Sequence, residues 1–125
     1  MTNSSSITET VDAYIAAWNE GEPERRRALV GQAFAAEATY VDPMMSGSGP
    51  DEIAGMIGAA QQQFPGHRFV LAAGPDAVGD HVRFVWRLEP TAGGPAVAVG
   101  HDFATVTGDG RLGDVVGFLE QAEAA

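Results

Sequence analysis

Three polar residues occupy positions where the surrounding pattern favours an apolar side chain. Tyr14 lies on the apolar stripe of the first predicted helix, Asp42 ends an apolar strand, and Asp102 lies inside another strand. A tyrosine hydroxyl and a protonated carboxyl group donate hydrogen bonds, whereas an ionised carboxylate accepts a proton. These three residues are therefore the candidates for acid–base chemistry, although Tyr14 alone is also explained as a core tyrosine with its hydroxyl at the rim.

The surroundings of Asp42 allow two interpretations. An Asx turn or a helix cap would give the carboxylate a structural role. Alternatively, the extended backbone that precedes Pro43 would hold the carboxylate at the mouth of a cavity. Because proline has no N–H, we expect few local backbone donors, which would leave the carboxylate partly unneutralised and basic.

Asp102 is unusual because aspartate is depleted in strands. Its neighbours on the same strand face are all small: Ala98, Gly100 and Ala104. Small neighbours would leave room for a cavity, and the opposite face of the strand is apolar too. Burial without a positive partner raises the pKa of a carboxyl group, and the protonated acid can then donate a hydrogen bond. The structural alternative is an aspartate at a sheet edge or a dimer rim.

Other kinds of site find no support in the sequence. The absence of cysteine excludes disulfides, thiolate ligands and thiol nucleophiles. The three histidines lack the spacing of helical metal ligands, so we predict no metal site, and His101 faces away from Asp102 in a regular strand. There is no glycine-rich phosphate loop and no Gly-x-Ser-x-Gly elbow, so we predict no cofactor.

Composition indicates one acidic, globular domain. The 125 residues include 17 Asp and Glu against 7 Lys and Arg, for a net charge of -10, and 45% of the residues are hydrophobic. The charge argues against nucleic acid and anionic membranes as partners, and the hydrophobic content argues against a disordered chain. No targeting segment or membrane-spanning run appears, so we expect a cytoplasmic protein with residues 1–6 disordered.

Hydrophobic periodicity predicts three helices and five strands. The first helix starts from a capping box at Ser6–Glu9 and stops at Gly21, the second runs from Pro23 through Phe34, and the third opens at Pro50. A short strand at 38–41 and a loop at 44–49 separate the second and third helices. Four strands with period two follow, within 68–73, 81–89, 96–107 and 112–119. This order predicts an α+β domain with the helices packed on one face of a curved antiparallel sheet.

Several segments resemble one known family. Residues 14–21, residues 34–43 and the Asp102 strand with the following Asp109-Gly110-Arg111-Leu112 are similar to the ketosteroid isomerase branch of the nuclear transport factor 2-like superfamily. SnoaL-like polyketide cyclases are close relatives, and the resemblance runs from about residue 7 to residue 119. It implies a single domain over 1–125, with a cone-shaped curved antiparallel sheet and three N-terminal helices on its concave face.

The resemblance also implies roles for the three polar residues. Tyr14 matches the family's oxyanion-hole tyrosine, Asp42 matches the general base that moves a proton between carbons, and Asp102 matches the protonated acid that donates the second hydrogen bond. Some relatives brace the catalytic tyrosine with further tyrosines, whereas Phe34 and Ile57 stand at the matching places here. We therefore expect a shorter network of hydrogen bonds around the oxyanion.

The implied activity is a cofactor-independent isomerase that removes a proton next to a carbonyl of an apolar, steroid- or polyketide-like substrate. An aldol cyclase acting on a polyketide is one alternative, and a non-catalytic small-molecule-binding or assembly domain is another. The residues expected to line the substrate pocket are Trp18, Phe34, Met56, Phe69, Phe84, Trp86 and Phe118. We also expect a homodimer formed through the sheet, because the family dimerises in this way and the strand at 96–106 is apolar on both faces.

Overall fold

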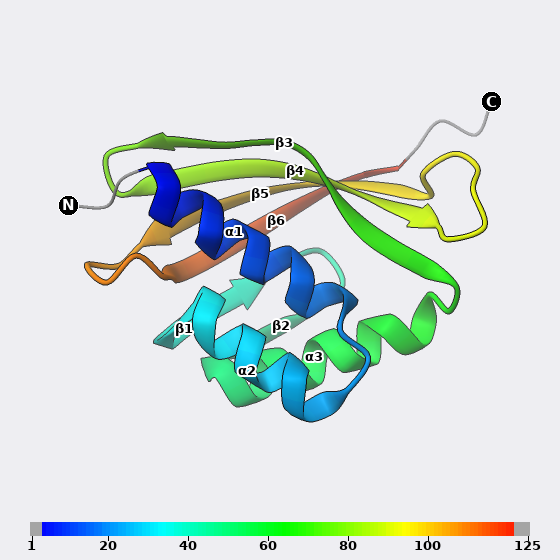
Figure 1. Cartoon of the computed structure of the whole chain (residues 1–125), viewed down its shortest axis with the longest axis horizontal. Coiled ribbons are helices and arrows are strands. Elements are labelled where there is room, and N and C mark those ends of the chain that lie inside the picture. Colours follow the sequence, from blue (N-terminus) through cyan, green and yellow to red (C-terminus); the bar gives the residue numbers. More distant parts are fainter. Residues whose placement is uncertain (1–3, 122–125) are drawn as a thin grey trace.

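The computed structural model describes residues 4–121 and contains three helices and six strands in this part of the chain (Figure 1). The helices are α1 (Ser4–Asn19), α2 (Pro23–Ala33) and α3 (Gly49–Gln63). The strands are β1 (Phe34–Val41), β2 (Ser46–Ser48), β3 (His67–Val78), β4 (His81–Pro90), β5 (Ala98–Val106) and β6 (Leu112–Gln121). The predicted α+β class is confirmed.

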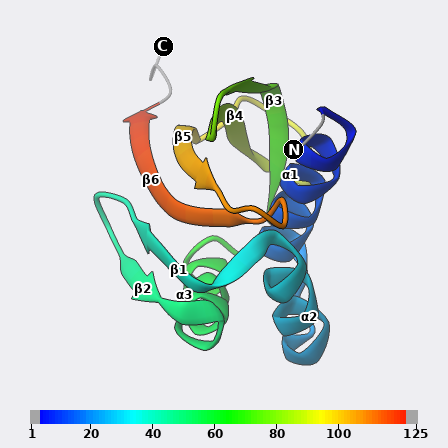
Figure 2. The ribbon, with the colours of Figure 1, turned by 90° about the vertical axis from the view of Figure 1, so that its left-hand side faces the viewer.

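The six strands form one curved, unclosed sheet in the order β2-β1-β6-β5-β4-β3 (Figure 2). All neighbouring strands are antiparallel except β1 and β6, which run parallel. The prediction of a wholly antiparallel sheet is wrong at this pair because α3 carries the chain to the far edge of the sheet. The meander from β3 then returns to place β6 beside β1. Register shifts in three of the pairs bend the strands and contribute to the curvature.

Two helix boundaries differ from the prediction. The first helix begins at Ser4, so Ser6 is not its N-cap and residues 4–6 are helical rather than disordered, since serine is tolerated inside a helix. Residues 1–3 lie outside the described residues. The second helix begins at Pro23 as predicted, and the Glu22 side chain caps it by accepting a hydrogen bond from the Arg25 N–H. It ends one residue early, because Phe34 is extended and opens β1.

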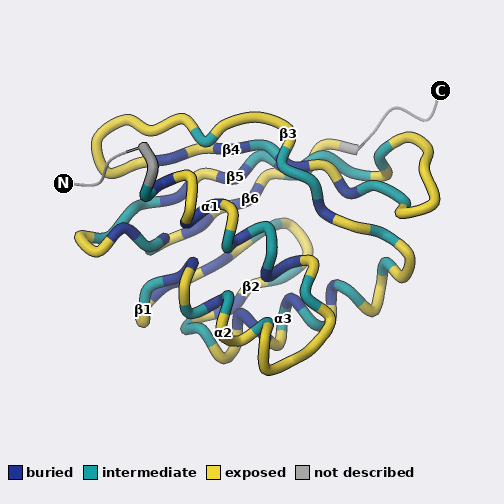
Figure 3. Tube along the Cα trace, viewed as in Figure 1, coloured by how far each residue is buried: buried dark blue, intermediate teal, exposed yellow. Residues whose placement is uncertain are grey.

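The core lies between the helices and one face of the sheet (Figure 3). Helix α1 packs against β3, α3 packs against β1 and β2, and α2 packs against both of the other helices. Strand β4 keeps the predicted alternation, with inner residues buried and His81, Arg83 and Arg87 exposed. Loop 44–49 contains a feature that the sequence did not reveal, the short edge strand β2.

Asn19 joins the end of α1 to the sheet. Its side-chain amide donates to the carbonyl of Phe69 at 2.8 Å and accepts from the N–H of the same residue at 2.7 Å. The amide thus pairs with the backbone of β3 as a neighbouring strand would, and it fixes the end of the helix that carries Tyr14.

We expect Asn19→Ala to lower the free energy of unfolding by about 1–3 kcal/mol, because it leaves both backbone groups of Phe69 unpaired at a partly buried position. Urea denaturation measures this loss. The control is Gln62→Ala, which removes an exposed amide from α3. Equal stability of the two variants would contradict the bridging role of Asn19.

Candidate functional site

Asp102 lies on the buried face of β5, between Phe84 of β4 and Gly117 of β6. Its side chain is 1% exposed. One carboxyl oxygen, Oδ2, accepts hydrogen bonds from the Tyr14 hydroxyl at 2.5 Å and from the Trp86 indole N–H at 3.0 Å. The other oxygen, Oδ1, is buried without a hydrogen-bond partner in the described part of the protein. The sheet-edge alternative for Asp102 is therefore excluded.

The room expected beside Asp102 is filled by Trp86. A Cβ atom added to Gly100 would lie 2.1 Å from two carbons of the Trp86 ring, so only glycine lets the indole cross β5 at this point. At Gly100, therefore, the room left by a small residue is taken by the Trp86 ring rather than by a cavity. Trp86 was expected only as apolar lining, but its N–H is a donor to Asp102, in line with the need of a buried indole for a partner.

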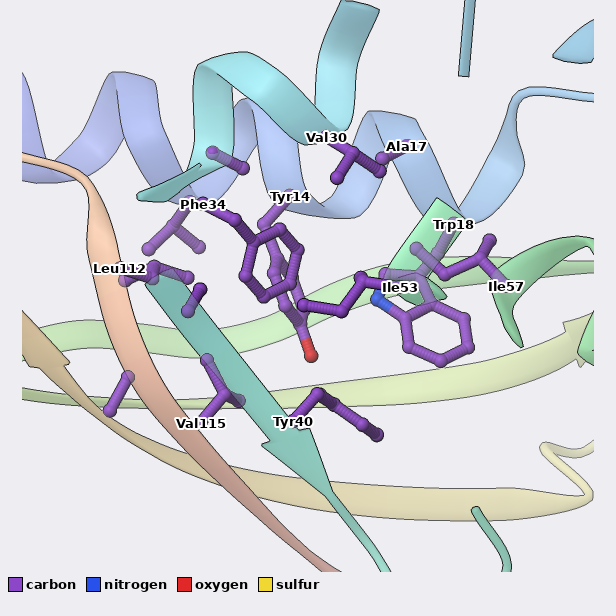
Figure 4. Packing of buried hydrophobic residues seen from close by; sticks show 14 of the residues in the cluster. Tyr14, Ala17, Trp18, Val30, Phe34, Tyr40, Ile53, Ile57, Leu112 and Val115 are labelled. Atoms are coloured by element: carbon purple, nitrogen blue, oxygen red, sulfur yellow. The ribbon is translucent and has the colours of Figure 1, made fainter. Parts of the chain in front are cut away.

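Tyr14 is 1% exposed and surrounded by aromatic rings (Figure 4). Its ring centroid lies 5.5 Å from that of Phe34, 5.0 Å from that of Phe84 and 6.2 Å from that of Trp18. Burial, together with the negative charge of nearby Asp102, holds the pKa of Tyr14 well above its ordinary value. The hydroxyl therefore keeps its proton and acts as a donor.

Asp42 follows β1 and forms an Asx turn. Its Oδ1 accepts from the backbone N–H groups of Met44 at 2.8 Å and Met45 at 2.9 Å, and its Oδ2 accepts from the Tyr40 hydroxyl at 2.6 Å. The expectation of few local donors is wrong, because the chain turns back just beyond Pro43. Tyr40 was not recognised from the sequence, although it lies two residues before Asp42 and so shares its side of an extended chain.

The side chains of Asp102 and Asp42 both lie beside Gly117. A Cβ atom on this residue would lie 2.8 Å from Asp102 Oδ1, 3.3 Å from the Cβ of Asp42 and 3.4 Å from the Tyr40 hydroxyl. The fold thus brings Tyr14, Asp42 and Asp102 together, with Tyr40 as a fourth polar member. Sequence reasoning missed Gly117, whose importance depends on a register that no local pattern reveals.

The environment of Asp102 favours its protonated form. Burial raises the pKa of this carboxyl group to about 6, while the hydrogen bonds from Tyr14 and Trp86 act in the opposite direction and the charge of Asp42 adds to the rise. Tyr40 is also buried, and burial with the charge of Asp102 raises the pKa of its hydroxyl. Asp42, in contrast, is only partly buried and accepts three hydrogen bonds.

Most of the predicted pocket residues gather around Tyr14. Trp18, Phe34, Phe69, Phe84 and Trp86 belong to one chain of ring contacts that also includes Tyr14 and Tyr40. Met56 is partly buried on α3 and packs against the core, but no contact places it at the site.

Phe118 does not belong to this site. It is 57% exposed and pairs in register with His101, and its ring contacts Phe103. Gly117, and not Phe118, lies opposite Asp102. The assignment of Phe118 to the pocket is therefore wrong, because the period of two residues turns its side chain to the other face of the sheet.

Two hollows indicate where a molecule has access to the protein. One of about 500 Å³ lies over the strands at Val78, Phe103 and Val116, away from Tyr14 and Asp102. A smaller hollow of about 150 Å³ lies between the end of α1 and β3 and is lined by Trp18 and Phe69. Since these two rings also belong to the aromatic cluster, the smaller hollow borders the site.

Neither a metal centre nor a membrane span emerges from residues 4–121. In this range no three His, Asp or Glu side chains gather so that they could hold a metal ion. The described helices are all too short or too polar to cross a membrane.

The raised pKa of Asp102 predicts a specific pH dependence of stability. The carboxyl group has a pKa of about 6 in the folded chain, against 3.8 ordinarily, so the folded state binds the proton more tightly. This stabilisation is fully present below about pH 4 and is lost as the pH rises through about 6. We expect the free energy of unfolding of the wild type, relative to Asp102→Asn, to fall by roughly 1.4 kcal/mol per pH unit across this window. Urea denaturation of both proteins at several pH values measures the difference, and parallel profiles would contradict it.

Comparison with known proteins places this chain in a family. The SnoaL-like domain matches residues 11–114. A solved protein of the SnoaL-like family from Agrobacterium tumefaciens str. C58, which carries the provisional designation of isomerase, is 50% identical over 93% of this chain and 98% of that chain, with a TM-score of 0.85. A comparison with curated proteins gives no match.

More distant structures share the fold. A protein from Catenulispora acidiphila with a ketosteroid isomerase-like fold, solved in complex with trimethylamine, is 20% identical over 87% of this chain and 83% of that chain, with a TM-score of 0.67. A SnoaL-like protein of unknown function from Burkholderia thailandensis is 14% identical over 98% of this chain and 100% of that chain, with a TM-score of 0.70. From the domain match and the identity to the Agrobacterium protein, the chain belongs to the SnoaL-like family.

Proposed function

We propose that this protein is a cofactor-independent isomerase that moves a proton between carbon atoms next to a carbonyl group. The observation that carries the proposal is that the side chains of two aspartates in unlike environments both lie beside Gly117. Asp102 is buried, which raises the pKa of its carboxyl group to about 6, whereas Asp42 is partly exposed and accepts three hydrogen bonds. Such a difference is what general acid–base chemistry needs from a pair of carboxyl groups.

In the proposed reaction, the Asp42 carboxylate removes a proton from the carbon beside the substrate carbonyl. In a β,γ-unsaturated ketone, the electron pair of the broken C–H bond forms a dienolate, whose negative charge extends from the carbonyl oxygen to the γ-carbon. Protonated Asp102 donates a hydrogen bond to the negative oxygen, and Tyr14 holds Asp102 in place by donating to its Oδ2 rather than to the substrate. Asp42 then returns the proton to the γ-carbon to give the conjugated ketone. An enolate that attacks a second carbonyl carbon of the same substrate would instead close a ring, which is the cyclase alternative.

The proposed substrate is apolar and carries a flat ring. The rings of Trp18, Phe69 and Trp86 contact one another in sequence, and Trp86 donates to Asp102, so apolar surface lies beside the polar group. Affinity would come from apolar contact, and orientation from few polar groups. The Agrobacterium relative of 50% identity, with its provisional designation of isomerase, supports the reaction class.

A binding domain for a small organic cation is the second candidate. The Catenulispora protein of similar fold was solved with trimethylamine. In this chain, the buried carboxyl of Asp102 lies among aromatic rings and forms no salt bridge with a described residue. An ionised Asp102 and the faces of these rings would suit an alkylammonium ion.

Two substitutions separate catalysis from binding. We expect Asp42→Asn to reduce kcat on a β,γ-unsaturated cyclic ketone by about 100- to 10,000-fold, since it removes the base, while affinity for a planar phenol is retained. Asp102→Leu should weaken both phenol binding and turnover, because a planar phenolate mimics the enolate oxygen. Turnover is followed by the absorbance of the conjugated product, and phenol affinity by calorimetry. Wild-type protein that binds trimethylamine, but neither binds phenols nor turns over ketones, would favour the second candidate.

We further propose that the protein forms a homodimer through the outer face of the sheet. Four apolar side chains are exposed there and form the outer apolar patch: Val41 at 46%, Phe103 at 46%, Val116 at 40% and Phe118 at 57%. Val116 pairs in register with both Val41 and Phe103, so the patch is continuous across three strands. A continuous apolar patch of this kind is a common feature of protein interfaces, and a two-fold dimer would bury the same patch on both subunits.

We expect the wild type to have twice the mass of the chain in light scattering and Phe118→Arg to have the mass of one chain, because burying an unpaired charge in the interface is unfavourable. Met44→Lys is the control, since Met44 is 58% exposed but lies outside the outer apolar patch. A wild-type monomer would refute the dimer.

A further inference from the structure

Two polar atoms of the site are buried without a hydrogen-bond partner among residues 4–121. They are the indole nitrogen Nε1 of Trp18 and the carboxyl oxygen Oδ1 of Asp102. The side chains are 6% and 1% exposed, respectively. Folded proteins leave few buried polar atoms unpaired, and those that remain often mark a functional site. These two unpaired atoms therefore indicate a place where a bound molecule supplies the missing hydrogen-bond partner.

Both atoms border the same group of side chains. Trp18 follows Tyr14 by four residues on α1, so the two side chains share one face of the helix. The indole nitrogen is directed toward the Tyr14 hydroxyl in the close view of the core (Figure 4). Burial and Asp102 hold the pKa of that hydroxyl well above its ordinary value, and Trp18 slightly opposes this rise. The Trp18 ring also contacts the ring of Tyr40 at 5.6 Å, and the Tyr40 hydroxyl and Asp102 Oδ1 flank Gly117.

The chemistry of the two atoms restricts what can satisfy them. An indole N–H can only donate a hydrogen bond. Asp102 Oδ2 already accepts from Tyr14 and Trp86, so the proton of the neutral carboxyl group belongs on Oδ1. Both atoms then present hydrogen, and the partner that each requires is an acceptor such as an oxygen atom with two lone pairs. An alkylammonium ion, which has no acceptor, would leave Trp18 unpaired.

We propose that Trp18 is a further hydrogen-bond donor of the site and that, together with Asp102, it binds the carbonyl or enolate oxygen of the ligand. This inference rests on the proposed function and extends it by one residue and by a choice of ligand chemistry. The ligand is a planar ring that bears an oxygen acceptor, and its apolar body enters from the hollow that Trp18 and Phe69 line. Trp18 then supplies a donor that the apolar residues Phe34 and Ile57 cannot.

Substituted phenols of increasing acidity test this role, since their anions carry the negative oxygen without reacting. In Trp18→Phe, which keeps a ring but loses the N–H, we expect about 10- to 100-fold weaker binding of the most acidic phenol, with a smaller loss for weakly acidic phenols. The matched control is Phe69→Leu, which removes a ring beside Trp18 but no donor. Its loss of affinity should be the same for every phenol.

A measurement on the wild type makes the test independent of how well the variants fold. The chain has two tryptophans, so its indole N–H groups give two nuclear magnetic resonance signals, which Trp18→Phe assigns. Binding of a phenolate should move the Trp18 signal downfield far more than the Trp86 signal, because the Trp86 N–H is already bonded to Asp102.

The outcomes separate this inference from the proposed function. Phenol binding that depends on acidity and requires Asp102, but is unchanged in Trp18→Phe, overturns the role of Trp18 and leaves the proposed function intact. An unmoved Trp18 signal in the phenol complex overturns it as well. Failure of the wild type to bind any phenol overturns the proposed function and the oxygen site together, and binding of trimethylamine in that case identifies a cation site.

Discussion

The buried carboxyl group of Asp102 is the constraint on which the rest of the structure depends. A carboxyl group that is 1% exposed needs hydrogen-bond donors from the protein itself. Tyr14 reaches it from α1 and Trp86 from β4, so these bonds also join the first helix to the sheet. Gly100 admits the Trp86 ring, and Gly117 leaves Oδ1 unobstructed. One helix residue, one strand residue and two glycines thus form the surroundings of this one carboxyl group.

The same constraint explains how two aspartates can have opposite roles within one site. Asp102 lies in the middle of a central strand, where burial disfavours the charged form and raises its pKa to about 6. Asp42 lies where β1 leaves the sheet, and the turn at Met44 and Met45 supplies donors to its carboxylate. Position in the fold, rather than residue type, therefore gives the two aspartates the unlike environments on which the proposed roles of proton donor and proton acceptor rest.

The sequence predicts the fold class and the polar centre because both leave local signals. Period-two alternation locates β4, and a polar residue inside an apolar stretch is conspicuous, as Tyr14 and Asp102 are. The partners of these residues leave no such signal, since Trp18, Tyr40 and Trp86 look like ordinary core residues until their polar tips are placed in space. The parallel pairing of β1 with β6 is equally invisible locally, because it depends on the path of the whole chain. The position of Phe118, in contrast, can be predicted locally, because the period of two residues in its own strand places it on the face opposite Gly117.

Placement of donors on rigid elements has a consequence for catalysis. Tyr14 and Trp18 are fixed by the four-residue spacing of one helix, and the Asn19 amide anchors that helix to β3 directly beyond them. Donors that are already in place need not reorganise when negative charge develops on a bound oxygen, which is how preorganised sites stabilise transition states. The surrounding rings exclude water, so each hydrogen bond acts in a medium of low polarity and is stronger than it would be in solution. In the proposed reaction a short network can therefore stabilise an enolate, because Tyr14 and Trp86 support Asp102 while Asp102 and Trp18 donate to the bound oxygen.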